Sequence, residues 1–309
     1  MTLAIRSLAL FALLGACSSE PDLSDPAAED TAGADQPSLL DEPDQPNEPD
    51  PGRPPVDLTR GARGMFAGQS FFVPVARSFD ALANGGDFPN HSIRTVFAGG
   101  PSGSPQALWE NPTRRAEIEE VLAAGDVDLF GLTIGEVDPD NPGEFYARWI
   151  DLALGYNPQT RIFVGFPYLQ FGPDKETDAF AQEIVDGGEA MFSLVEGLRG
   201  VYPDTEILYV NYGPVLSEMK EDFEAGELAD LEGLAAPPGT QDTSPYLFAD
   251  GGVGHAGPMA EHICALVWLN LLYGAEIGPY VDPAYDAEDI ERIAAEVIAS
   301  NQPFRVDAE

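Results

Sequence analysis

The sequence is poor in cysteine, histidine and positive charge. Its 309 residues include 2 cysteines, 3 histidines, and 15 Lys and Arg against 53 Asp and Glu, which gives a formal net charge of -38. Binding a nucleic-acid backbone requires clustered Lys and Arg that release counterions, so this charge excludes nucleic acid as the natural partner. It also argues against adsorption to an anionic lipid surface. We interpret the acidity as that of a solvated surface.

The N-terminal residues form a short leader. Arg6 precedes an apolar run at residues 8–14. This run is too short to span a bilayer as a mature helix and has the form of a secretory signal peptide. Residues 14–17 read Leu-Gly-Ala-Cys, which resembles the lipobox of bacterial lipoproteins. The resemblance implies a lipoprotein signal peptide at 1–16 and a lipidated Cys17 as the mature N-terminus. The alternative is an ordinary signal peptide with a chance cysteine.

Cys17 and the residues that follow it predict a protein that is tethered to a membrane of the bacterial cell envelope. Ser18, in place of an aspartate, implies by the same resemblance that the anchor lies in the outer membrane. Several acyl chains on one residue anchor a protein firmly, whereas a single chain holds only marginally. The rest of residues 17–60 is rich in Asp, Glu and Pro without apolar periodicity. We expect a disordered, extended tether, because such a segment cannot bury enough surface to order itself.

The cysteines carry no further chemistry in this interpretation. With Cys17 assigned to lipid, Cys264 has no partner, so no disulfide is predicted within the chain. Cys264 lies in an apolar helix-like run and is expected to be a small core residue. Neither a zinc ligand set nor a cysteine nucleophile beside a base is visible. We therefore expect no metal and no cofactor.

From residue 61 to 309, short apolar runs alternate with amphipathic stretches. Strands that are apolar on both faces and separated by helices predict a parallel sheet covered on both sides. The expected fold class is α/β, a three-layer α/β/α sandwich in one domain. The predicted strands are 63–67, 93–97, 127–132, 161–166 and 206–210. The predicted helices are about 70–84, 113–124, 143–154, 175–199, 214–226, 257–273 and 286–300.

The first predicted strand is followed by Gly68, Gln69 and Ser70. A serine at the end of a buried strand leaves its hydroxyl at the carboxyl edge of the sheet, where open α/β sheets bind their ligands. The neighbouring glycine allows the sharp turn. The pattern makes Ser70 the candidate nucleophile, and the alternative is that Ser70 only caps the next helix.

A second candidate lies near the other end of the chain. His255 falls in a glycine-rich segment, 250–257, just before a predicted helix. Glycines are kept where the chain must turn tightly or approach something closely. We predict that His255 is a catalytic base, with a structural loop residue as the alternative. Of the other histidines, we expect His91 in a surface loop and His262 in a packed or exposed helical position.

Together these features resemble the SGNH/GDSL hydrolase superfamily, over residues 64–274. The resemblance implies that Ser70 is the nucleophile, His255 the general base and Asp250 the acid that orients the histidine. The chemistry fits, because a serine hydroxyl needs a base to take its proton and the imidazole needs a partner to fix its tautomer. The interval from Asp250 to His255 is longer than is usual in the family. We expect a glycine bulge to absorb the difference.

The same resemblance implies donors for an oxyanion: the nucleophile's own N–H, a glycine after the second strand and an asparagine after the third. The loop 99–104 offers Gly100 as the first candidate and Gly103 as the second. After the third strand, the family's Gly-x-Asn-Asp block is missing. Asn141 reaches back, or Thr133 substitutes, or the oxyanion hole is incomplete.

These expectations combine into a lipid-anchored extracytoplasmic serine esterase, acting on an acyl ester for which an acetylated carbohydrate is one hypothesis. Trp109, Tyr168 and Tyr212 lie near predicted strand ends and could stack on sugar rings, although such residues are as often core. The alternative is a catalytically inactive SGNH-like domain that binds glycan or a surface partner. A large distance between Ser70 and His255 would favour that alternative.

Overall fold

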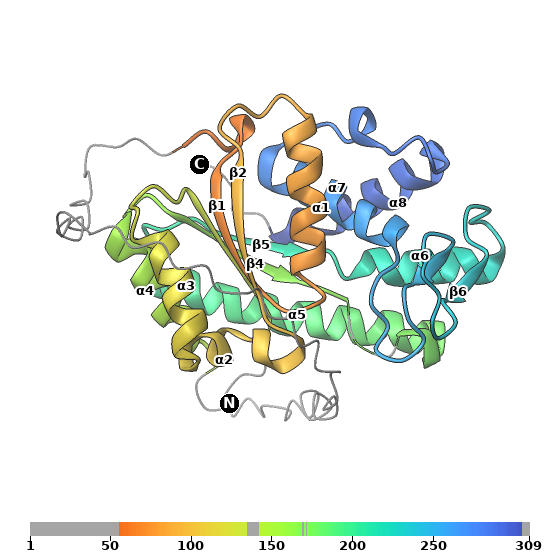
Figure 1. Cartoon of the computed structure of the whole chain (residues 1–309), viewed down its shortest axis with the longest axis horizontal. Coiled ribbons are helices and arrows are strands. Elements are labelled where there is room, and N and C mark those ends of the chain that lie inside the picture. Colours follow the sequence, from red (N-terminus) through yellow and green to blue (C-terminus); the bar gives the residue numbers. More distant parts are fainter. Residues whose placement is uncertain (1–55, 135–141, 169, 171, 305–309) are drawn as a thin grey trace, which may run out of the picture.

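The computed structural model describes residues 56–134, 142–168, 170 and 172–304. These residues form a central sheet of 5 parallel strands in the order β2-β1-β3-β4-β5, with helices on both faces (Figure 1). The predicted three-layer α/β/α sandwich is therefore confirmed. The strands are β1 (Arg63–Gly68), β2 (Ser92–Phe97), β3 (Leu129–Thr133), β4 (Arg161–Phe166) and β5 (Ile207–Asn211).

Burial along the strands follows their places in the sheet. Strands β1, β3 and β4 are buried along nearly their whole length, as expected for parallel strands covered on both faces. Strand β2 lies at the edge and is exposed at Ser92, Arg94 and Phe97. Each strand lies within a few residues of its predicted range, because a continuous apolar run bounded by turn residues is a local signal.

The helices divide between the two faces of the sheet. Helices α1 and α7 pack together on one face, and α3, α4 and α5 cover the other (Figure 1). Asn111 and Asp286 accept N–H groups of the first turns of α3 and α8, which fixes where those helices begin. The helices that the periodicity predicts are α1 (Val73–Gly85), α3 (Pro112–Leu122), α4 (Glu144–Tyr156), α5 (Thr177–Val201), α6 (Pro214–Ala225), α7 (Pro258–Tyr273) and α8 (Ala287–Ser300).

Some short elements are absent from the predicted set. Helix α2 (Pro105–Glu110) has six residues, too few for a helical period to show. Strands β6 (Gly233–Ala235) and β7 (Tyr246–Phe248) form a separate parallel pair of three-residue strands. Strand β7 leads directly into the segment that carries His255, so this small sheet bears on the site.

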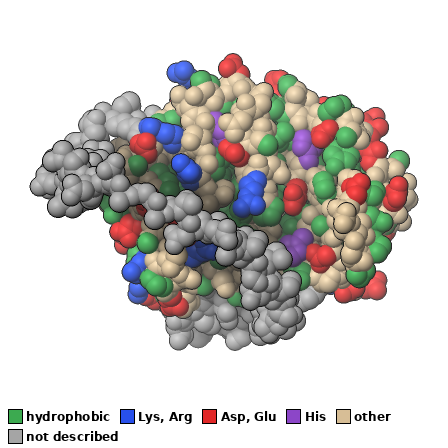
Figure 2. Space-filling view, in the orientation of Figure 1, with side chains coloured by type: hydrophobic (Ala, Val, Ile, Leu, Met, Phe, Trp, Pro, Cys, Tyr) green, Lys and Arg blue, Asp and Glu red, His purple; other side chains and the backbone are tan. Residues whose placement is uncertain are grey.

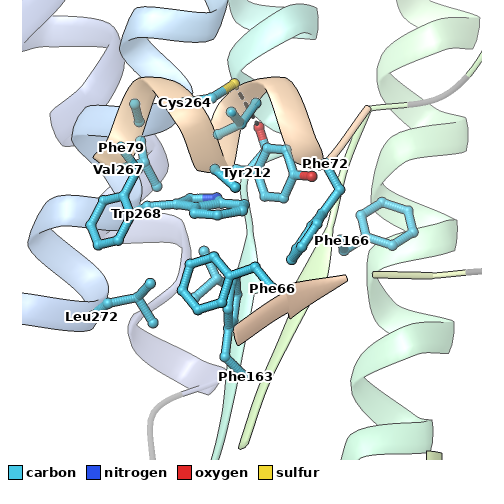
Figure 3. Packing of buried hydrophobic residues seen from close by; sticks show 14 of the residues in the cluster. Phe66, Phe72, Phe79, Phe163, Phe166, Tyr212, Cys264, Val267, Trp268 and Leu272 are labelled. Carbon is cyan, nitrogen blue, oxygen red and sulfur yellow. Dashed lines mark hydrogen bonds between the residues drawn. The ribbon is translucent and has the colours of Figure 1, made fainter. Parts of the chain in front are cut away.

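An aromatic layer fills the space between the sheet and α7. The Trp268 ring lies 6.0, 5.0 and 4.8 Å from the rings of Phe66, Phe72 and Phe163 (Figure 3). Glycines in the strands make the room. A Cβ added to Gly131 would lie 2.8 Å from the Phe66 ring, and one added to Gly165 would lie 2.7 Å from the Phe72 ring. This layer anchors the first turn after β1, where Ser70 lies.

The predicted membrane attachment falls on residues that the structure does not describe. The signal peptide at 1–16, the lipid on Cys17 and the tether as far as residue 55 lie outside the described residues, so they stay predictions. The predicted end of the disordered tether at residue 60 is wrong, because Leu58–Arg60 form the short helix η1 and Leu58 is buried in the core. Within the part of the chain that the structure describes, no helix is both long enough and apolar enough to cross a bilayer. Cys264 is buried in α7, as predicted for a small core residue, and its thiol is free.

Candidate active site

Ser70 lies where β1 ends, at the carboxyl edge of the sheet. In the strand order β2-β1-β3-β4-β5, the chain moves from β1 to β2 in one direction and later to β3 in the other. Ligands of open α/β sheets bind in the crevice outside the carboxyl ends at such a switch point. Ser70 therefore occupies the position where this fold class keeps its site.

The turn that carries Ser70 is held by its neighbours. The carbonyl of Gln69 accepts the N–H groups of Phe72 (3.1 Å) and Val73 (3.0 Å), so the chain folds back directly after the strand. Gly68 must be small, because an added Cβ would lie 2.8 Å from both the Phe72 ring and the Thr133 methyl. The helix α1 begins only at Val73. Ser70 is thus in the turn before the helix and is not its N-cap.

The three residues predicted as a catalytic set lie in one hydrogen-bonded chain. The Oγ of Ser70 is 2.9 Å from Nε2 of His255, and Nδ1 of His255 is 2.6 Å from Oδ2 of Asp250. The side chains of His255 and Asp250 are 36% and 38% exposed, so the set is open to solvent from one side. In this arrangement Nδ1 donates to the carboxylate and Nε2 is left to accept the serine proton.

The long interval between Asp250 and His255 is absorbed by a loop that wraps the carboxylate. Oδ1 of Asp250 accepts the N–H groups of Gly252 (3.0 Å) and Gly254 (2.9 Å), and Oδ2 also accepts the N–H of His255 (3.2 Å). Gly254 has φ of 85°, a conformation that favours glycine. The expected glycine bulge is therefore a closed turn around the carboxylate.

Electrostatics keep this carboxylate ionised. Burial by itself raises the pKa of Asp250, but the hydrogen bonds from the Gly254 N–H and the His255 ring outweigh it, and the pKa lies below the usual value. In the first turn of α7, by contrast, burial raises the pKa of Glu261 to about 7. Glu261 therefore releases its proton less readily than a solvated carboxyl group does.

The base of the histidine loop is fastened to strand β7. Phe248 and Ala256 form an antiparallel bridge, and the N–H of Ala249 donates to the carbonyl of His255 at 2.7 Å. Gly257 then donates to Leu247 at 2.7 Å, in a space where an added Cβ would lie 2.0 Å from the Tyr246 carbonyl oxygen. Backbone hydrogen bonds therefore hold both ends of the loop in place, and His255 lies next to them.

The glycine loop after β2 lies against the serine turn through Gly103. A Cβ added to Gly103 would lie 2.5 Å from the Ala98 carbonyl oxygen and 2.7 Å from Cα of Gln69. Gly100 begins the short helix η2 (Gly100–Gly103) with φ of 51° and open space around it. Gly103, the second of the two candidate glycines in this loop, is therefore the one that contacts the serine turn.

Replacing Gly103 by alanine should lower kcat/KM for an ester by about 10- to 100-fold, because the new Cβ displaces the turn that carries Ser70 and small misplacements at a reacting centre are costly. Steady-state kinetics on a purified, folded variant measure this. Gly155→Ala is the matched control, since a Cβ there meets nothing within 4 Å. Gly103→Ala with wild-type kcat/KM would contradict the close approach.

The third predicted donor is not located by the structure. Asn141 lies outside the described residues. Thr133, the substitute donor, ends β3 with its side chain fully buried, and its Oγ1 has no hydrogen-bond partner among the described residues. Its methyl group faces Gly68, and its carbonyl accepts the hydroxyl of Tyr146 at 3.0 Å. Thr133 is therefore packed beneath the serine turn and does not line an open site.

The other two histidines are structural. His91 was expected in a surface loop, and that prediction is wrong: its side chain is 1% exposed, with Nε2 2.9 Å from Asp80 and Nδ1 2.8 Å from the Tyr273 hydroxyl. Burial lowers the pKa of His91 despite the neighbouring carboxylate. His262 lies in α7, half-buried, and accepts the N–H of Asp282 at 3.0 Å, which agrees with the expected packed or exposed helical position.

Two of the three aromatic residues that we expected to stack on sugar rings are buried. Tyr168 is 2% exposed and Tyr212 is 0% exposed, so both belong to the core. Trp109 is half-buried, with its ring against Trp149 and with the guanidinium of Arg115 at 5.6 Å from its centroid. The expectation of stacking by the two tyrosines is therefore wrong.

The described side chains were compared with what a metal site requires. Among the described residues, no group of three or more His, Cys, Asp or Glu side chains could hold a metal ion. Figure 2 shows Asp and Glu side chains spread over the visible face, with few Lys and Arg between them, as the composition leads one to expect.

Comparison with known proteins adds little. No protein-family model and no curated protein matches the chain. Among solved structures, the chain is similar to the periplasmic domain of a lipopolysaccharide acetyltransferase from Salmonella ser. Paratyphi A, at 14% sequence identity and a TM-score of 0.41, covering 71% of this chain and 85% of that one. This likeness is too slight to bear on the activity.

Proposed function

We propose that the protein is a serine esterase of the SGNH kind, which hydrolyses an acyl ester outside the cytoplasm. The observation that carries the proposal is the continuous chain from Ser70 Oγ through the His255 ring to the Asp250 carboxylate, at 2.9 and 2.6 Å. A nucleophile hydrogen-bonded to a base that is itself oriented by a third group is the signature of covalent catalysis by serine.

The distances support a two-step acyl transfer. Nε2 of His255 takes the proton of Ser70 as Oγ attacks the ester carbonyl, and the imidazolium that forms is stabilised by Asp250. The protonated ring then gives its proton to the alcohol that leaves. Water, deprotonated by the same nitrogen, attacks the acyl-serine, and the acyl–Oγ bond then breaks as Nε2 gives its proton to Ser70 Oγ. The acid is released, and Ser70 and His255 are back in their starting states.

The oxyanion of each tetrahedral intermediate requires hydrogen-bond donors. Among the described residues, the backbone N–H of Ser70 has no hydrogen-bond partner, so it is free to donate. Gly100 begins η2, where the first N–H groups of a helix have no partner within it, so Gly100 stays the second donor that we favour, while Gly103 packs against the residue before the serine. Asn141 remains the candidate for the third. Removing one such donor typically costs about 100-fold or more in rate, so two donors suffice for measurable activity.

The proposed setting is a lipid anchor on Cys17 in the bacterial cell envelope, in the outer membrane by the resemblance of residues 14–18 to a lipobox. The substrate class is an acyl ester. Because Tyr168 and Tyr212 are buried, the carbohydrate hypothesis has no support from them. A panel of acetylated glycans and simple esters, scored by the acid released, would name the substrate.

The inactive binding module is the alternative. It predicts a serine and a histidine that are far apart, whereas the two side chains lie 2.9 Å from each other. It also has no need for the closed turn that orients the histidine through Asp250. The geometry therefore favours the esterase.

A fluorophosphonate probe should label the protein once, at Ser70, because such probes trap an activated serine hydroxyl. The tryptic peptide 64–77 contains Ser70 as its single serine, so mass spectrometry of that peptide locates the label. Heat-denatured protein and Ser70→Ala should remain unlabelled. A label on another residue, or one that persists in Ser70→Ala, would remove Ser70 from the proposed role.

A further inference from the structure

Two buried tyrosines stand beside the proposed site without belonging to it. Tyr168 follows β4 and Tyr212 follows β5, so both lie at the carboxyl edge of the sheet. Both are almost fully buried, and burial holds the pKa of each hydroxyl well above its ordinary value. Each hydroxyl therefore stays neutral and available for one fixed hydrogen bond.

Each tyrosine contacts the backbone beside one reacting residue. The hydroxyl of Tyr212 donates to the carbonyl of Phe71 at 2.8 Å, next to Ser70 in the chain. The hydroxyl of Tyr168 accepts the N–H of Ala256 at 2.7 Å, next to His255. The two bonds thus fix the nucleophile and the base from strands that carry neither.

The ring of Phe71 joins the two halves. Its centroid lies 4.8 Å from the Tyr168 ring and 5.1 Å from the His255 imidazole, so Phe71 packs between them. Phe71 is 3% exposed, so its ring is packed on nearly all sides. Tyr168 therefore reaches the histidine in two ways, through the backbone at Ala256 and through the face of Phe71.

We propose that Tyr168 is a positioning residue, which fixes the distance between Ser70 and His255. The inference rests on the proposed function, because a reacting distance matters only if the pair reacts. Segments of the chain 185 residues apart meet at a 2.9 Å contact, and neither the serine turn nor the histidine loop makes that contact by itself. Tyr168 contacts both of these segments, the serine turn at Phe71 and the histidine loop at Ala256.

Tyr168→Phe removes only the hydroxyl and leaves the buried N–H of Ala256 without its partner. We expect kcat for an aryl ester and the rate of fluorophosphonate labelling to fall about 10- to 100-fold, since a small displacement of a reacting group is costly, while KM changes less than about threefold. Tyr209→Phe is the matched control. Its buried hydroxyl donates to the Gly188 carbonyl at 2.8 Å, away from the site.

Thermal melts of both variants separate stability from positioning. The inference is supported if both variants lose a comparable amount of stability while kcat falls only in Tyr168→Phe. It is overturned if kcat is equal in the two variants. Should Tyr168→Phe fail to fold, Phe71→Leu replaces it, because it removes the ring between Tyr168 and His255 but keeps the backbone bond to Tyr212. Wild-type kcat in Phe71→Leu then overturns the inference. If the wild-type protein itself is not labelled, the proposed function fails, and the positioning role fails with it.

Discussion

Ser70→Ala should lower kcat for a short-chain aryl ester by about 10⁵- to 10⁶-fold, the loss seen when the nucleophile of a serine hydrolase is removed. The reason is that His255 would have no hydroxyl to deprotonate and no acyl-enzyme could form. Binding and the remaining oxyanion donors would survive, because the alanine methyl group occupies less space than the hydroxymethyl group. KM should therefore change little. Stopped assays with high enzyme concentration are needed to measure so small a residual rate.

The control for this variant is Ser193→Ala. Ser193 lies on α5 and donates to the Glu189 carbonyl at 2.9 Å, so its loss tests whether removing any serine hydroxyl affects turnover. It should leave kcat unchanged. If Ser70→Ala, folded by circular dichroism, retained more than a hundredth of wild-type kcat, the serine mechanism would be wrong and the ester would have to be attacked by another group.

The fold could be predicted because its signals are local. Strands β1, β3 and β4 are continuous apolar runs, and helices α1 and α4 carry their buried apolar residues at helical spacing. The differences from the predicted elements lie at the start of one helix and in elements that are only a few residues long. The first helix was predicted from residue 70, but residues 70–72 form a turn, and α1 begins at Val73 with Pro74 in its first turn. Helix α2 and the strands β6 and β7 are too short to show periodicity.

The candidate site was predictable in its residue types and not in its geometry. Ser70 and His255 stand out by their glycine-rich surroundings, and the structure brings them together with Asp250. The wrapping of Asp250 by N–H groups could have been suspected from the glycines between it and the histidine. The role of Tyr168 could not, since its partners Phe71 and Ala256 are far away in the sequence.

The burial of His91 could not be predicted either, because it depends on residues that are distant in the sequence. Its neighbours Phe88, Pro89 and Asn90 are typical of a loop, which made an exposed position reasonable. What buries the ring is Tyr273, from the end of α7, together with Asp80 from α1. A contact across 182 residues leaves no trace in a local pattern.

Asp250→Asn should lower kcat by about 10³- to 10⁴-fold while leaving the fold intact, because an asparagine in this position stabilises the wrong tautomer of the histidine. In the wild-type protein the carboxylate accepts the Nδ1 proton at 2.6 Å, which leaves Nε2 free to take the proton of Ser70. An amide would direct its own N–H toward Nδ1. The ring would then carry its proton on Nε2, facing the serine, and could not act as a base.

The stability of Asp250→Asn has its own dependence on pH. Because hydrogen bonds hold the pKa of Asp250 below its usual value, the carboxylate stabilises the folded state above the unfolded pKa, and this contribution is lost as the pH falls through the lowered folded pKa. The difference in melting temperature between wild type and variant should therefore shrink in acid. Asp242→Asn is the control, since Asp242 also accepts a backbone N–H, that of Ser244 at 3.0 Å, in a more exposed turn. That variant should keep wild-type kcat. If Asp250→Asn also kept it, the histidine would be oriented by another group, and Asp250 would serve only to close the loop.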